Sequence, residues 1–136
     1  MPGWDGIVDA VRGNSWVPEG MSAWEMGVDE DVTAKADEDY NGRTADPLGL
    51  AKAEVTFIFI TPRRWPNRDS WATAKRAEGE WKDVRAYDAD SLELWLDQTP
   101  AAHARITAML GRKPDSAADL ESAWNDWAAR TIPKAG

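Results

Sequence analysis

The sequence contains no cysteine and only one histidine, His103, and both facts exclude kinds of site. Without cysteine there is no disulfide, no thiolate zinc site and no cysteine nucleophile, which is typical of proteins in a reducing cytoplasm. A single histidine does not make a histidine-based zinc site, because zinc takes several protein ligands. We therefore expect His103 to be an ordinary surface residue.

Long apolar runs and signal patterns are also missing. The longest apolar run, residues 55–60, is too short to span a bilayer, and the N-terminus shows no basic segment followed by an apolar one. No glycine-rich phosphate loop precedes a predicted helix, and no nucleophile elbow surrounds a serine. These absences predict a cytoplasmic protein without a membrane span, and they give no support to the usual nucleotide sites.

Positive charge is scarce. The chain has 16 Lys and Arg against 24 Asp and Glu, a net charge of −8. General electrostatic binding of nucleic acid needs clustered basic residues, so the overall balance argues against it. The charge is uneven, however, because residues 63–85 contain seven basic residues and four acids. That window predicts either a local basic face or a solvated surface of mixed sign.

Tryptophan is abundant, with nine in 136 residues, and 43% of the chain is hydrophobic. This length and composition predict one globular domain with a substantial core. Indole rings mostly pack in protein cores or interfaces, since each buries about 150–250 Å². We expect packing roles for Trp4, Trp24, Trp65 and Trp71. The same excess leaves open an α/β domain that binds other proteins.

Local patterns predict a series of short elements. Strands are expected at 4–11, 16–17 and 22–28, as an antiparallel meander, and again at 55–60 and 81–87. Helices are expected at 34–43, with Thr33 as N-cap, at 70–79, and at 92–96, capped by Asp90 or Ser91. Two more helices are expected at 101–110 and 116–131.

The order of these elements predicts the fold class. Residues 55–60 are apolar on both faces, which suits a central strand covered on both sides. A crossover helix between 55–60 and 81–87 makes those two strands parallel. We predict an α/β domain with a mixed central sheet and flanking helices at 1–98, followed by a small helical extension at 99–136.

Two carboxylates stand inside apolar and aromatic segments instead of charged runs: Asp5 and Glu25. Asp5-Gly6 is also a common turn dipeptide, so a turn-forming role for Asp5 stays open. A buried carboxylate needs a partner, and a shared metal supplies one. Phosphodiester cleavage uses a hard divalent cation held by carboxylates and water. We expect Asp5 and Glu25 to lie on adjacent strands and to share Mg²⁺ or Mn²⁺.

These residues and the element order resemble the PD-(D/E)xK restriction-endonuclease-like superfamily, closest to its Mrr-type and Holliday-junction-resolvase-type branch. Gly3-Trp-Asp-Gly6 stands where the family places its first acid, and Trp24-Glu-Met-Gly27 where it places the Glu-x-Lys half. Residues 57–62 and 84–96 are similar to its later half. The two motifs together also resemble the front of large bacterial proteins that look like anti-phage effectors. The resemblance covers roughly residues 3–97.

The resemblance implies a Mg²⁺- or Mn²⁺-dependent endodeoxyribonuclease, with Asp5 and Glu25 as catalytic metal ligands. The expected lysine is replaced by Gly27, and in this superfamily the lysine can move to the following helix. Lys35 is then the first candidate to activate water, and Arg43 the second. The implied partners are DNA, further domains of the same polypeptide and other copies of the chain.

Two alternatives stay open beside this interpretation. Arg63, Arg64 and Arg68 follow the central strand and either bind the DNA backbone or keep the surface soluble. The missing lysine and the negative charge favour a degenerate nuclease fold that serves as a binding or assembly module.

Overall fold

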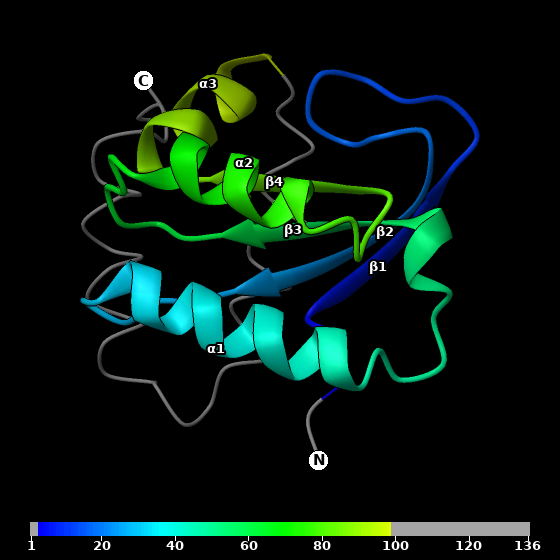
Figure 1. Cartoon of the computed structure of the whole chain (residues 1–136). Coiled ribbons are helices and arrows are strands. Elements are labelled where there is room, and N and C mark those ends of the chain that lie inside the picture. The colour runs from blue at the N-terminus through cyan, green and yellow to red at the C-terminus, as the bar shows by residue number, and fades with distance from the viewer. Residues whose placement is uncertain (1–2, 99–136) are drawn as a thin grey trace.

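The computed structural model describes residues 3–98 of the chain (Figure 1). In this part the chain is an α/β fold with one four-stranded mixed sheet and three α-helices. His103, the two predicted helices at 101–110 and 116–131, and the whole extension at 99–136 lie outside the described residues. No helix in the described part has the length and apolar character needed to cross a membrane.

The sheet has the strand order β1-β2-β3-β4. Its strands are β1 (Gly6–Ala10), β2 (Gly20–Met26), β3 (Val55–Ile60) and β4 (Asp83–Tyr87). β1 and β2 are antiparallel, whereas β2, β3 and β4 run parallel to one another. The predicted mixed sheet and the predicted parallel pairing of 55–60 with 81–87 are confirmed.

Helices connect the parallel strands. α1 (Val32–Ala45) and the short 3₁₀ helix η1 (Lys52–Glu54) lie between β2 and β3, α2 (Arg68–Ala77) lies between β3 and β4, and α3 (Ala89–Gln98) follows β4. All six residues of β3 are buried, as predicted for a central strand covered on both faces.

Two predicted details are wrong for local reasons. Residues 16–17 form no strand, because the Asn14 side chain accepts the Trp16 and Val17 amides at 2.8 Å and holds them in a turn. The helix caps are also displaced. The carboxylate of Asp31, not Thr33, accepts an amide of the first turn of α1. In α3 that role belongs to Asp88, whose Oδ1 accepts the amides of Asp90 and Ser91.

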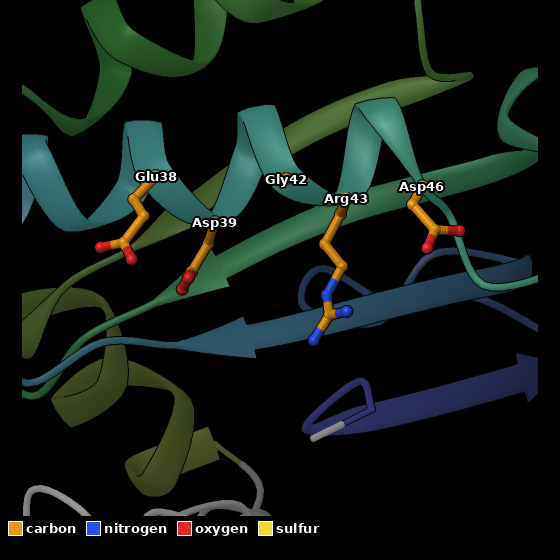
Figure 2. Close-up of a pocket in the computed structure, with 5 residues that line it drawn as sticks. All are labelled: Glu38, Asp39, Gly42, Arg43 and Asp46. Carbon is orange, nitrogen blue, oxygen red and sulfur yellow. The ribbon is translucent and has the colours of Figure 1, made fainter. Parts of the chain in front are cut away.

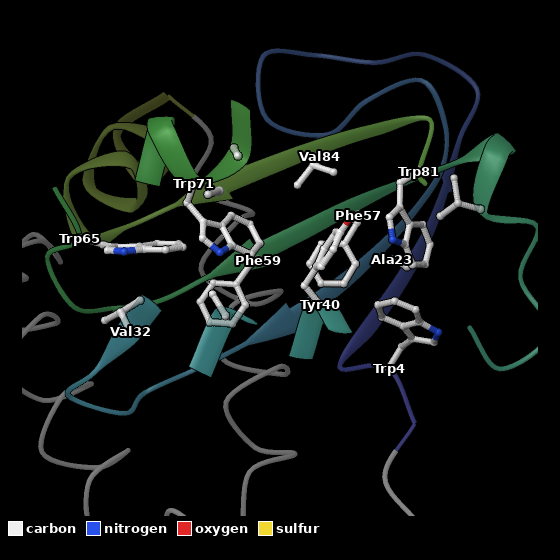
Figure 3. Packing of buried hydrophobic residues seen from close by; sticks show 14 residues of the cluster. Trp4, Ala23, Val32, Tyr40, Phe57, Phe59, Trp65, Trp71, Trp81 and Val84 are labelled. Atoms are coloured by element: carbon white, nitrogen blue, oxygen red, sulfur yellow. The ribbon is translucent and has the colours of Figure 1, made fainter. Parts of the chain in front are cut away.

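The two faces of the sheet have separate aromatic cores. α3 covers one face, where Trp24 and Trp95 stack at 5.7 Å between ring centroids. α1 and α2 cover the other face, which holds four tryptophans (Figure 3). Trp4, Trp24, Trp65 and Trp71 are all buried, so their predicted packing roles are confirmed.

Indole N–H groups fix the position of α1 on its face of the sheet. The helix buries only Val32, Ala36 and Tyr40. Its polar side chains instead accept hydrogen bonds from tryptophans elsewhere in the chain: Thr33 from Trp65 at 2.9 Å, Asp37 from Trp71 at 2.8 Å, and Thr44 from Trp81 at 2.9 Å. Spacings of four and seven residues put the three acceptors on one side of the helix. These bonds therefore set the rotation of α1, and with it the direction of Lys35 and Arg43.

Candidate functional site

Asp5 and Glu25 meet where β1 begins and β2 ends. The Asp5 amide donates to the carbonyl of Trp24 at 3.1 Å, and its Oδ2 accepts the amide of Met26 at 2.8 Å. Asp5 thus extends the pairing of the two strands and is buried beside Glu25, with 5% of its surface exposed. The two acids therefore lie side by side, as predicted, although Asp5 is in a bend one residue before β1 and only Glu25 lies within a strand.

Glu25 lies on the α1 side of the sheet, because Trp24 and Met26 on either side of it fill the opposite core. It is 2% exposed. Burial is the largest cause of a Glu25 pKa raised to about 8, followed by the negative charge of Asp5 and a side-chain hydrogen bond with Asp5. Two acids that share a buried site hold a proton or another cation between them.

Arg43 supplies a positive charge to this pair from α1. Its Nε donates to Oε1 of Glu25 at 2.7 Å, and its Nη2 donates to the carbonyl of Gly3 at 3.0 Å. The guanidinium also lies over the Trp4 ring, 5.1 Å from the centroid. Figure 2 shows Arg43 reaching from the helix toward the strands below. Arg43 lowers the pKa of Glu25, but burial and Asp5 outweigh it.

A hollow of about 310 Å³ lies along α1 beside Arg43. Its other lining residues are Glu38, Asp39, Gly42 and Asp46 (Figure 2). Three of these are acidic, so the hollow beside Arg43 carries negative charge. A phosphate backbone is repelled by such a lining, whereas cations are attracted.

Gly27 stands at the position where the resembled family has lysine, and a side chain does not fit there. An added Cβ would lie 2.6 Å from Cζ of Phe59 and 2.8 Å from Cγ of Lys35. The stem of Lys35 therefore already lies over Gly27. Its Nζ is 3.1 Å from Oδ1 of Asp39. Burial lowers the pKa of Lys35, but Asp39 and the acids around it raise it more, so the ammonium keeps its proton.

The three arginines that follow β3 differ in their surroundings. Arg63 donates through Nε to the carbonyl of Val28. Arg68 lies 3.5 Å from Oδ1 of Asp88, which also helps to anchor Trp65. Arg64 is exposed, whereas Arg63 and Arg68 are half-buried. Local packing thus uses Arg63 and Arg68, and Arg64 is the best placed of the three to meet a ligand.

The chemistry of Asp5 and Glu25 fits Mg²⁺ or Mn²⁺. Such ions take oxygen ligands, often one or two carboxylates with water and substrate completing the shell. Within residues 3–98 there is no group of three or more His, Asp or Glu side chains that could hold a metal. Among the described residues, Asp5 and Glu25 would be the ones to hold such an ion.

No family model, curated protein or solved structure matches the chain. The structure itself supports the α/β class with a mixed sheet. The nuclease hypothesis rests on the two motifs and on the meeting of their acids.

The sequence did not predict the ion pair of Arg43 with Glu25. Arg43 appeared only as the second candidate for the lysine role, although in the structure it is the side chain that pairs with Glu25. The only signal was a basic residue two turns beyond Lys35 on α1, and a helical repeat does not say which strand residue it faces.

Proposed function

We propose that this chain is a nuclease-like domain of the restriction-endonuclease-like class, which hydrolyses phosphodiester bonds of DNA with Mg²⁺ or Mn²⁺. The observation that carries this proposal is the buried pair formed by Asp5 and Glu25 at the end of two paired strands. We further propose that the domain acts in the cytoplasm as an effector module, in bacterial defence.

Each residue has a defined part in this proposal. A bound divalent ion would stabilise negative charge on the phosphoryl group and activate water. Asp5 and Glu25 would hold that ion, and the hydrogen bond from the Met26 amide keeps Asp5 oriented. Lys35 keeps its proton, which suits it to orient water or phosphate as an ammonium and not to accept a proton.

DNA contact would come mainly from outside the acidic hollow. Arg64 is exposed at the loop after β3 and would meet the phosphate backbone, with Arg63 and Arg68 stabilising that loop. The net charge of −8 makes a single copy a weak DNA binder. Further domains of the polypeptide, or other copies of the chain, would supply the remaining affinity.

Cleavage of plasmid and linear DNA in Mn²⁺ tests the proposal. Wild type is compared with Asp5→Asn and Glu25→Gln, which keep the shape of the side chains and remove their charge. Asp9→Asn is the matched control, because Asp9 is an exposed acid on β1. We expect cutting by wild type and Asp9→Asn, and its loss in the other two. Folded wild type without any cutting would contradict the proposal.

A second candidate function is a degenerate nuclease fold that serves as a binding or assembly module. The ion pair between Arg43 and Glu25 favours it, because a guanidinium already neutralises a carboxylate that the metal would use. This candidate predicts that Asp5→Asn and Glu25→Gln leave binding to a partner domain unchanged, while no variant cuts DNA.

A further inference from the structure

The candidate site already contains a positively charged group, the guanidinium of Arg43. Nε of Arg43 is 2.7 Å from Oε1 of Glu25, and the side chains are 14% and 3% exposed. Two ionised carboxylates and one guanidinium carry a net charge of −1, so Arg43 offsets part of the negative charge of the pair. The structure thus shows a carboxylate oxygen of Glu25 that already has a positively charged partner within the chain.

A divalent ion at the two carboxylates would meet the positive charge of Arg43, which already contacts Oε1 of Glu25. With Arg43 in place, two carboxylates and a divalent ion sum to +1; without it, they sum to zero. Unbalanced charge is costly in a buried site, because water is not there to solvate it. Divalent binding and the Arg43–Glu25 contact therefore oppose each other.

The hollow along α1 is a second position that the Arg43 side chain could take. Arg43, Asp39 and Asp46 all line the hollow of about 310 Å³, and Asp39 there also pairs with Nζ of Lys35 at 3.1 Å. Asp39 lies four positions before Arg43 on α1, a spacing at which side chains on one helix meet, and Asp46 is the C-cap residue directly after the helix. Gly42 adds room, since a Cβ built on it has nothing within 4 Å.

We propose that Arg43 competes with a divalent ion for the carboxylate of Glu25. It pairs with Glu25 when no ion is bound, and it moves further into the hollow along α1 when Mg²⁺ or Mn²⁺ binds. This inference rests on the metal site of the proposed function. Arg43 is then a positioning residue that sets metal affinity. The acidic hollow, which is unsuited to DNA, would receive the displaced guanidinium.

The direct test follows the Arg43 Nε–H resonance of the wild-type protein by ¹H–¹⁵N NMR during a Mg²⁺ titration. The Arg43→Gln spectrum assigns the signal. We expect it to shift with the same midpoint that calorimetry gives for Mg²⁺ binding. A signal that stays in place while Mg²⁺ saturates the protein would overturn the inference.

Two variants test the same competition through Mn²⁺ affinity measured by calorimetry. Arg43→Gln should bind Mn²⁺ about tenfold more tightly or better, the scale on which one charge at this distance shifts the titration of a carboxyl group. Arg76→Gln is the control, because Arg76 makes a 2.7 Å ion pair with Asp83 at the surface. Equal or weaker binding by Arg43→Gln would contradict the competition.

Filling the hollow gives a variant that leaves Arg43 and both acids intact. Gly42→Leu places a side chain where Arg43 has to move, and leucine suits a helix better than glycine does. We expect several-fold weaker Mn²⁺ binding than in Asn41→Leu, which adds the same side chain one position away. Equal affinities in these two variants would count against the hollow as the second place for Arg43.

The binding results separate this inference from the proposed function. Arg43 displacement without DNA cleavage would support the inference and remove the nuclease function. DNA cleavage without displacement of Arg43 would support the nuclease function and overturn the inference. No divalent binding by folded wild type and Arg43→Gln would overturn the inference.

Discussion

Arg43 on α1 and Glu25 on β2 form a buried ion pair, with 2.7 Å between Nε and Oε1. The contact joins the helix to the sheet at the place where Asp5 also arrives. It ties the stability of the fold to the charge state of the candidate site. Changes at Arg43 or Glu25 should therefore be visible in unfolding experiments without metal or DNA.

The first prediction concerns pH and stability in the presence of a chelator. The pKa of Glu25 rises from 4.5 to about 8 on folding, through burial and the neighbouring Asp5, against the opposing charge of Arg43. A carboxyl group whose pKa is raised on folding favours the protonated folded state. The Glu25 contribution should thus be most favourable below about pH 4.5, decline as pH rises toward 8, and level off above it. Chemical denaturation at several pH values, with Glu25→Gln as reference, measures this. A wild-type stability that runs parallel to that of Glu25→Gln between pH 5 and 8 would contradict it.

The second prediction concerns the removal of Arg43. Arg43→Gln leaves the buried acids without their guanidinium and should lower the free energy of unfolding by about 3 kcal/mol at high pH. The loss should shrink at pH 5, where Glu25 is protonated. The surface pair of Arg76 and Asp83 is the control, and Arg76→Gln should cost less than about 1 kcal/mol. Equal losses in the two variants would be evidence against a special burial of the Arg43 pair.

The third prediction concerns two glycines with opposite surroundings. Gly27→Ala places a Cβ 2.6 Å from Cζ of Phe59, so it should destabilise the fold by about 1–3 kcal/mol. Gly42→Ala adds a Cβ in open space within α1 and should stabilise it by about 0.5–1 kcal/mol. Thermal unfolding should show a lower melting temperature for Gly27→Ala and a higher one for Gly42→Ala than for wild type. A stable Gly27→Ala protein would show that a side chain fits at the position that Lys35 covers.

The fourth prediction concerns the hydrogen bonds that hold α1. Thr33→Val keeps the side-chain shape but removes the acceptor of the Trp65 indole N–H, which is buried in the core. An unsatisfied buried donor costs about 1–3 kcal/mol, so unfolding should become easier by that amount. The Trp65→Phe variant removes the donor instead. The double variant should then lose less than the sum of the two single changes, and a simple sum would argue against the bond.

The sequence predicted the parts of the fold that depend on local pattern. The apolar run at 55–60 identified a central strand, and the helix after it made the next strand parallel. The approach of Asp5 and Glu25 was also predictable, since Glu25 lies in an apolar strand and Asp5 directly precedes the strand that pairs with it. Residues 16–17 were misjudged because the Asn14 turn depends on side-chain geometry, which alternation does not reveal.

The pairing of Arg43 with Glu25 was beyond sequence reasoning for a different reason. The direction in which a helix residue points depends on the rotation of the helix against the sheet. For α1 that rotation is set by the indoles of Trp65, Trp71 and Trp81, which lie 32, 34 and 37 residues from their acceptors. Such long-range bonds leave no mark in the local pattern around residue 43.

Calorimetric titration with Mn²⁺ at pH 8 tests the central claim most directly, because it measures whether Asp5 and Glu25 hold a metal at all. Wild type and the Asp9→Asn control should bind one ion, and Asp5→Asn and Glu25→Gln should each lose that binding while staying folded. Equal binding by all four proteins, or no binding by folded wild type, would contradict the account.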